Sequence, residues 1–270
     1  MVPRTDRPAV LAARRQLTPS TYAVRFQLEG PFPTPDPGQF VMVEIPEGGG
    51  TFWRRAYSLS AFGQGSEGPW IEMMIKVVGP GTAHWRTAPL GSRGRILGPL
   101  GNGFPMDEVT GPVAMVAGGI GLPPLLHAMA GLAPRGVRCD LYLGAATADE
   151  LIEPEGCARA AAETGGTFVA ATDDGSAGEP GLVTAALERR LAAGERYAAL
   201  WACGPNPMLR AVARLAAGHG LAAWLSLEER MACGVGVCLG CVVPASGGGH
   251  LRVCREGPVF PADAIRWEAL

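Results

Sequence analysis

A chain of 270 residues, 47% of them apolar, is long enough for two compact domains of roughly 100–200 residues each. The formal net charge of −2 excludes the strongly basic surface typical of nucleic-acid binding, and no run of about 20 apolar residues could span a membrane. The amino terminus carries charges but no apolar signal-peptide core. We therefore expect a soluble cytoplasmic protein that binds neither nucleic acid nor membrane.

Residues 1–109 show the pattern of an antiparallel β-barrel. Turn-rich stretches with Gly and Pro separate short apolar or alternating runs, at residues 21–28, 39–45, 54–62, 70–78 and 94–101. Several strands at this spacing are typical of a small barrel or sandwich.

One of these strands carries Arg55, Tyr57 and Ser58. They offer a cation for a pyrophosphate, an aromatic ring to pack on a ring system, and a hydroxyl for a ring nitrogen. An ordinary alternating strand would show the same residues. Further on, Gly79, Gly81 and Thr82 form a turn whose amides and hydroxyl could hold a phosphate.

Residues 110–223 alternate strands with helices. Apolar strands are predicted at 113–117, 138–145, 167–174 and 197–204, and helices at 182–193 and 206–220. This alternation predicts a parallel sheet covered by helices on both faces.

Glycine turns follow two of these strands. Gly119 and Gly121 allow a tight strand-to-helix turn that points a helix amino terminus at a phosphate, although Pro124 stands where the dinucleotide fingerprint has its third glycine. Cys203 and Gly204 begin a second such turn. Because the carboxyl ends of parallel strands meet at one edge, both turns are expected at one nucleotide crevice. Tight turns with no ligand remain the alternative.

The preference between NAD and NADP rests on two further stretches. Thr172, Asp173, Asp174 and Ser176 either lie near the nucleotide or cap the next helix. No Arg or Lys follows the strand at 138–145, where a 2′-phosphate would need one, and this favours NAD.

The region 224–270 contains four clustered cysteines with the spacing C-x4-C-x2-C-x12-C, namely Cys233, Cys238, Cys241 and Cys254. The first three reproduce the run of plant-type 2Fe–2S ferredoxins, and the fourth completes the set of thiolates. A zinc ribbon would more often show two C-x2-C pairs, and a disulfide or a structural role is the remaining alternative.

Glycines separate the cysteines of this cluster. Gly234, Gly236 and Gly240 are expected to let the loop turn tightly and to aim backbone N–H groups at the sulfurs.

In order, the chain offers a flavin barrel, a nucleotide domain and a 2Fe–2S loop. This order, with "SLEERMACGVGVCLGCVVP" and "RVCREGPVF", resembles the electron-transfer subunit of the NAD-linked, two-subunit dihydroorotate dehydrogenase, within the ferredoxin–NADP reductase superfamily. The predicted architecture is a multidomain β plus α/β chain. It has an antiparallel flavin-binding β-barrel (1–109), a parallel-sheet NAD-binding domain (110–223) and a small 2Fe–2S loop domain (224–270).

The resemblance implies a function. Such a subunit binds FAD and a 2Fe–2S cluster and relays electrons between NAD(H) and an FMN-containing catalytic subunit, which oxidises dihydroorotate in pyrimidine biosynthesis. It also implies a heterotetramer with two copies of each subunit. Carried over by residue, Arg55, Tyr57 and Ser58 would contact FAD, Gly81 and Thr82 would lie at its phosphates, and the four clustered cysteines would ligate iron.

Two positions depart from the family pattern. Ala56 and Tyr57 replace its usual proline and aliphatic residue, and Ala146 stands where an arginine is common. Three alternatives therefore remain: the flavin and 2Fe–2S subunit of an NADH-dependent ferredoxin:NADP oxidoreductase or sulfide dehydrogenase type complex, a self-contained reductase, and a non-catalytic redox sensor. We expect no catalytic acid–base pair, and Cys203 either tunes hydride geometry or is a buried apolar residue.

Overall fold

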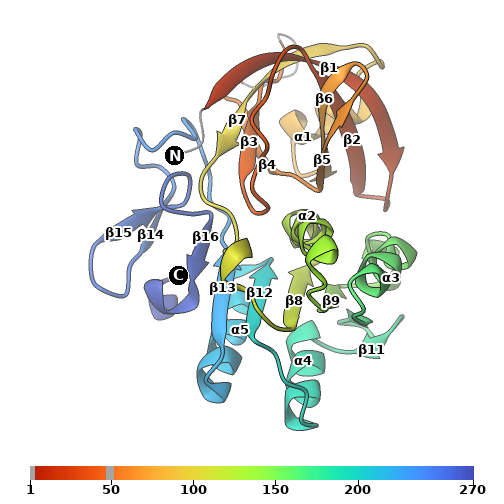
Figure 1. The fold of residues 1–270 in the computed structure, drawn as a ribbon. Coiled ribbons are helices and arrows are strands. Elements are labelled where there is room, and N and C mark those ends of the chain that lie inside the picture. Colours follow the sequence, from red (N-terminus) through yellow and green to blue (C-terminus); the bar gives the residue numbers. More distant parts are fainter. Residues whose placement is uncertain (1–3, 47–51) are drawn as a thin grey trace.

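The structure, a computed structural model, describes residues 4–46 and 52–270. A curved β-sheet stands over a second sheet flanked by helices, and the carboxyl-terminal segment lies beside both (Figure 1). Across the described ranges, no helix is long and apolar enough to cross a membrane.

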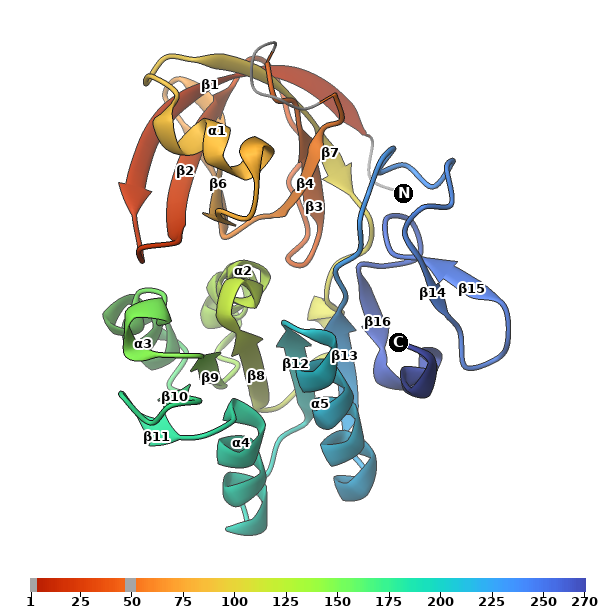
Figure 2. The same ribbon diagram turned by 180° about the vertical axis from the view of Figure 1, so that it is seen from behind.

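The amino-terminal sheet is antiparallel and strongly curved (Figure 2). Its seven strands lie in the order β4-β3-β7-β1-β2-β6-β5. Their bounds are β1 Thr5–Gln16, β2 Thr21–Leu28, β3 Phe40–Val43, β4 Arg55–Ser58, β5 Ala61–Gly65, β6 Gly68–Lys76 and β7 Arg93–Leu100. The predicted antiparallel β fold is therefore confirmed.

The single strand predicted at 54–62 is in fact two strands, β4 and β5, at opposite ends of the strand order, and two further elements, β1 and α1, were not predicted. Strand β1 buries only Ala9 and Leu11 fully, and it is otherwise too polar for its alternation to stand out. Helix α1 (Pro80–Thr87) follows β6, and its Trp85 packs edge-on against Phe26 in the barrel core, with ring centroids 4.9 Å apart.

The central sheet is parallel, as predicted. Its order is β11-β10-β9-β8-β12-β13-β16, with only β16 antiparallel to its neighbour. The strands are β8 Val113–Gly118, β9 Cys139–Ala145, β10 Phe168–Thr172, β11 Glu179–Pro180, β12 Ala199–Cys203, β13 Ala222–Ser226 and β16 Val259–Pro261.

Four helices cover this sheet: α2 (Leu122–Leu132), α3 (Pro154–Glu163), α4 (Val183–Ala192) and α5 (Asn206–His219). Helices α2 and α3 lie together on the side of the barrel, and α4 and α5 lie together on the opposite face (Figures 1 and 2). Helix α3 was not predicted.

The carboxyl-terminal segment is tied to the central sheet. It contains the hairpin β14 (Val242–Pro244) and β15 (His250–Arg252), and then β16, which pairs with β13. The predicted boundary between residues 223 and 224 falls inside β13. The three domain limits remain predictions.

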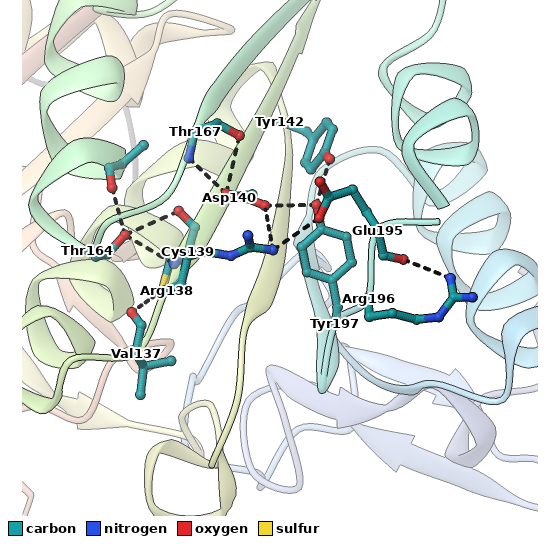
Figure 3. A network of polar contacts seen from close by, with 11 residues as sticks. Val137, Arg138, Cys139, Asp140, Tyr142, Thr164, Thr167, Glu195, Arg196 and Tyr197 are labelled. Carbon is teal, nitrogen blue, oxygen red and sulfur yellow. Dashed lines mark hydrogen bonds and ion pairs between the residues drawn. The ribbon is translucent and has the colours of Figure 1, made fainter. Parts of the chain in front are cut away.

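A buried polar network connects neighbouring segments at the amino ends of the central strands (Figure 3). Asp140 in β9 accepts hydrogen bonds from the backbone N–H of Thr167 at 2.8 Å and from the Tyr197 hydroxyl at 2.9 Å. The Tyr142 and Tyr197 hydroxyls lie 2.9 Å apart, and Arg138 bridges Asp140 and Glu195. A buried carboxylate needs such partners, and here they join three segments of the domain.

Candidate cofactor sites

A cavity of about 650 Å³ lies at the carboxyl ends of the central strands. Gly118, Gly119, Ile120 and Gly121 line it after β8, and Gly204 to Met208 line it after β12. The structure therefore brings the two predicted glycine turns to one crevice.

The two turns approach each other so closely that position 121 requires a glycine. A Cβ at this position would lie 2.0 Å from the backbone oxygen of Cys203, far inside contact distance. Helix α2 then begins at Leu122 with proline in its first turn, where no N–H is needed. The turn suits a phosphate at the amino terminus of α2.

Cys203 does not line the nucleotide cavity, unlike the predicted glycines Gly119, Gly121 and Gly204. Its side chain is fully buried, burial raises the pKa of its thiol, and it is not among the described residues that line the cavity. Only its backbone shapes the crevice, through the contact with Gly121. Its predicted role beside the nicotinamide stays a prediction.

Of the polar residues between β10 and α4, only Asp173 lines the nucleotide cavity. Asp174 accepts hydrogen bonds from the backbone N–H and hydroxyl of Ser176, and Thr172 donates to the backbone of Ala177. Helix α4 has no side-chain cap, so these residues do not cap it. The carboxylate of Asp173 would repel a 2′-phosphate, which favours NAD.

A second cavity, of about 290 Å³, opens where the barrel meets the other two parts of the chain. Tyr57, Ser58 and Thr82 line it from the barrel. The remaining wall includes Ile120 and Pro123 from the nucleotide domain, and Leu227, Met231 and Pro258 from the carboxyl-terminal part.

Tyr57 is buried in the barrel wall, and its hydroxyl has no hydrogen-bond partner. Burial raises the pKa of that hydroxyl, so it remains a donor. Orphaned buried hydroxyls are rare and call for a ligand or a water. The aromatic ring of Tyr57 and the hydroxyl of Ser58, both in the wall of this cavity, fit a flavin ring.

The other predicted flavin residues lie outside this lining. Arg55 donates to the backbone oxygen of Trp53 at 2.8 Å. Gly79 and Gly81 stand at the start of α1, where the Thr82 hydroxyl accepts the backbone N–H groups of Val78 and Gly79, at 2.9 and 3.0 Å. This helix terminus is suited to an anion, and its role at the FAD phosphates stays a prediction.

The cluster loop divides its four thiols into two pairs. Cys238 donates its backbone N–H to the Cys233 sulfur at 3.5 Å, and Cys254 donates to the Cys241 sulfur at the same distance. Among residues 4–46 and 52–270, no three His, Cys, Asp or Glu side chains converge as they would around a single ion. Two pairs of thiols match the two irons of a 2Fe–2S cluster, each of which takes two protein thiolates.

Backbone donors favour the thiolate at Cys233. Burial alone would raise the pKa of its thiol, but N–H groups of Cys238, Val235 and Val237 point at the sulfur and lower the pKa to about 6. Iron is bound by thiolates, so this arrangement fits a ligand.

The loop depends on Gly234 and Gly236, which have φ values of 66° and 84°. The prediction for Gly240 was wrong: the residue with left-handed backbone there is Leu239, and a Cβ at Gly240 would make an ordinary contact with the Cys238 sulfur.

Arg252 stabilises this loop. The sequence pattern did not indicate this role. Its guanidinium donates to the backbone oxygen of Gly236 at 2.9 Å and pairs with Glu256.

Comparison with known families matches two parts of the chain. Residues 115–214 match the model of the oxidoreductase NAD-binding domain, and residues 228–266 match the iron–sulfur cluster binding domain of dihydroorotate dehydrogenase B. The fold and the sites thus define an NAD-linked oxidoreductase with a flavin barrel and an iron–sulfur loop, in which FAD, a 2Fe–2S cluster and NAD(H) are the cofactors, as predicted.

Whole-chain relatives identify the family. The chain is 38% identical to the dihydroorotate dehydrogenase B (NAD(+)) electron transfer subunit of Geobacillus thermodenitrificans, over 94% of this chain and 96% of that protein. It is 37% identical to the subunit of the same name from Enterococcus faecalis, over 97% and 98%. The chain belongs to the family of dihydroorotate dehydrogenase B electron transfer subunits, which confirms the predicted resemblance.

A solved structure shares the fold over most of the chain. The structure of an NADH-dependent reduced ferredoxin–NADP oxidoreductase superposes with a TM-score of 0.82 at 26% identity, covering 96% of this chain and 90% of that chain. The reductase class of fold is thereby confirmed.

Proposed function

We propose that this chain relays electrons between NAD and the FMN-containing catalytic subunit of a dihydroorotate dehydrogenase, as part of pyrimidine biosynthesis. The single observation that carries the proposal is the cavity lined by Tyr57 and Ser58. Its wall includes Ile120 from the nucleotide domain and Met231 from the segment that leads into the cluster loop. A flavin held there borders the sites of both other cofactors.

The cofactors supply the redox chemistry: a bound flavin exchanges a two-electron hydride with nicotinamide and single electrons with an iron–sulfur cluster. The protein orients them. The turn at Gly118 to Gly121 directs the amino terminus of α2 at the nucleotide phosphates, Ser58 offers a hydroxyl to the flavin ring, and loop N–H groups hold the thiolate of Cys233.

The partner in this proposal is the catalytic subunit implied by the names of the relatives. The cluster loop presents a surface suited to a protein partner, because Val237 and Leu239 are 77% and 59% exposed on either side of the exposed Cys238. We propose a heterotetramer with two copies of each subunit. We place it in the cytoplasm, where thiols stay reduced, since no disulfide joins any of the seven cysteines, all of which the structure describes.

The experiment is anaerobic purification of the chain with whatever co-purifies from its host, followed by addition of dihydroorotate and NAD+. Bleaching of flavin and cluster absorption, with formation of orotate and NADH, is the expected result. If NADH bleaches the complex but dihydroorotate does not, the proposed catalytic partner is wrong. The alternative is then a ferredoxin-linked complex, which the similarity to the ferredoxin–NADP oxidoreductase structure favours.

A further inference from the structure

Lys76 is the only lysine in the 270 residues; the other 22 Lys or Arg positions are arginine. This single lysine lies at the carboxyl end of β6. Lysine differs from arginine in carrying a compact charge on a flexible stem, with rotatable donors in place of a rigid planar fork.

Lys76 lines both the nucleotide cavity and the flavin cavity. Of the described residues that line the nucleotide cavity, Lys76 is the only cation, whereas Glu150, Asp173 and Glu228 are acids. The pyrophosphate of a nicotinamide dinucleotide adds two negative charges to this acidic lining. A cation beside it removes much of the repulsion.

In the structure Lys76 is paired with a carboxylate from the opposite domain. Its Nζ lies 2.9 Å from Glu150 Oε2, and the Ser20 hydroxyl donates to Glu150 Oε1 at 3.0 Å. The Lys76 and Glu150 side chains are 41% and 31% exposed, so the pair is accessible to an incoming anion. A half-exposed ion pair of this kind is weak enough to be exchanged.

We propose that Lys76 is the positioning residue for the nucleotide pyrophosphate, and that its ammonium group leaves Glu150 for the phosphate when the nucleotide binds. The inference rests on the proposed function, because it takes the cavity to hold NAD(H). Glu150 is then a competitor of the nucleotide for the same cation. An arginine here would hold Glu150 through a bidentate fork, whereas the single ammonium group of a lysine can exchange one anion for another.

If Lys76 exchanges Glu150 for the phosphate, substitutions of these two residues should change the NAD+ affinity in opposite directions. Lys76→Met should weaken NAD+ binding about tenfold, the effect of losing one hydrogen-bonded charge partner. Glu150→Gln should tighten NAD+ binding about threefold, since it removes the competitor while keeping the shape of the side chain. If the pair only held the two domains together, both substitutions would weaken binding.

The binding experiment is isothermal titration of NAD+ into the full chain carrying FAD and its cluster. Arg15→Met is the matched control, because Arg15 forms an ion pair with Glu153 between the same two domains, and neither residue lines the nucleotide cavity. Its dissociation constant should stay that of the wild type. Lys76→Arg should restore only part of the affinity lost in Lys76→Met, because its bidentate fork holds Glu150 more firmly than an ammonium group does.

A spectroscopic test needs no turnover. Reductive methylation with 13C-formaldehyde labels one side chain, Lys76, besides the amino terminus. ADP-ribose, which has the pyrophosphate without nicotinamide, should shift the Lys76 signal, and free nicotinamide should not. An unmoved signal at saturating ADP-ribose, or an unchanged NAD+ affinity in Lys76→Met, would overturn the inference.

Two outcomes separate this inference from the proposed function. Loss of FAD from Lys76→Met would show that the lysine serves the flavin, and it would overturn the inference while leaving the relay intact. A wild-type chain that binds no NAD+ would overturn the proposed function and the inference together.

Discussion

Replacing Tyr197 by Phe tests the polar network at the amino end of the central sheet most sharply (Figure 3). The substitution removes a hydroxyl that donates to the buried Asp140 carboxylate at 2.9 Å. A hydrogen bond to a buried charge contributes about 1.5–3 kcal/mol. The Tyr142 hydroxyl, 2.9 Å from that of Tyr197, also loses its partner, which adds about 1 kcal/mol. We expect the free energy of unfolding to fall by about 3 kcal/mol.

Tyr142→Phe is the matched control. It removes only the contact between two neutral hydroxyls and leaves Tyr197 free to donate to Asp140, so its expected cost is about 1 kcal/mol. Urea denaturation of both variants, with the wild type alongside, measures the difference. Because the network lies at the strand ends opposite the nucleotide cavity, both variants should bind NAD+ with wild-type affinity. Equal losses for the two variants would refute the assignment of Asp140 as the charged centre of the network.

Three further outcomes are expected. Gly121→Ala should abolish NAD+ binding in a titration, because its Cβ would meet the Cys203 backbone oxygen at 2.0 Å; wild-type affinity would show that this turn does not hold the nucleotide. Cys238→Ser should lose the visible cluster spectrum, whereas Cys157→Ser, at a buried free thiol, should keep it; equal spectra would contradict the ligand assignment. Burial lowers the pKa of His127 to about 4, so the unfolded chain binds more protons between about pH 4 and 6.5 and stability falls as the pH drops through that range. Between pH 7.5 and 5 this costs about 2 kcal/mol, a loss that His127→Gln should lack in urea denaturation at the two pH values.

The predictions from the sequence succeeded where a local pattern controls the structure. Alternation gave most of the barrel strands, and strand–helix alternation gave the parallel sheet. The glycine turns converge because parallel strands end at one edge. Strand β1 was missed because only Ala9 and Leu11 are fully buried, so tertiary pairing rather than its own pattern holds it in the sheet.

Contacts between distant segments explain most of what the sequence did not reveal. Lys76 and Glu150 are 74 residues apart, and neither stands in a recognisable motif. Arg252 reaches the cluster loop through Gly236, 16 residues away. Leu239 has the left-handed backbone in the part of the loop where Gly240 was expected to allow a tight turn.

The direct test of the relay is an anaerobic stopped-flow experiment on the complex of the chain with its catalytic subunit. Dihydroorotate and NAD+ are mixed with the wild-type complex and, separately, with the Cys238→Ser complex. NADH formation is followed in each reaction. We expect NADH only from the wild type, while NADH added to either complex still bleaches the flavin. NADH formation at the wild-type rate by Cys238→Ser would contradict an electron path through the cluster.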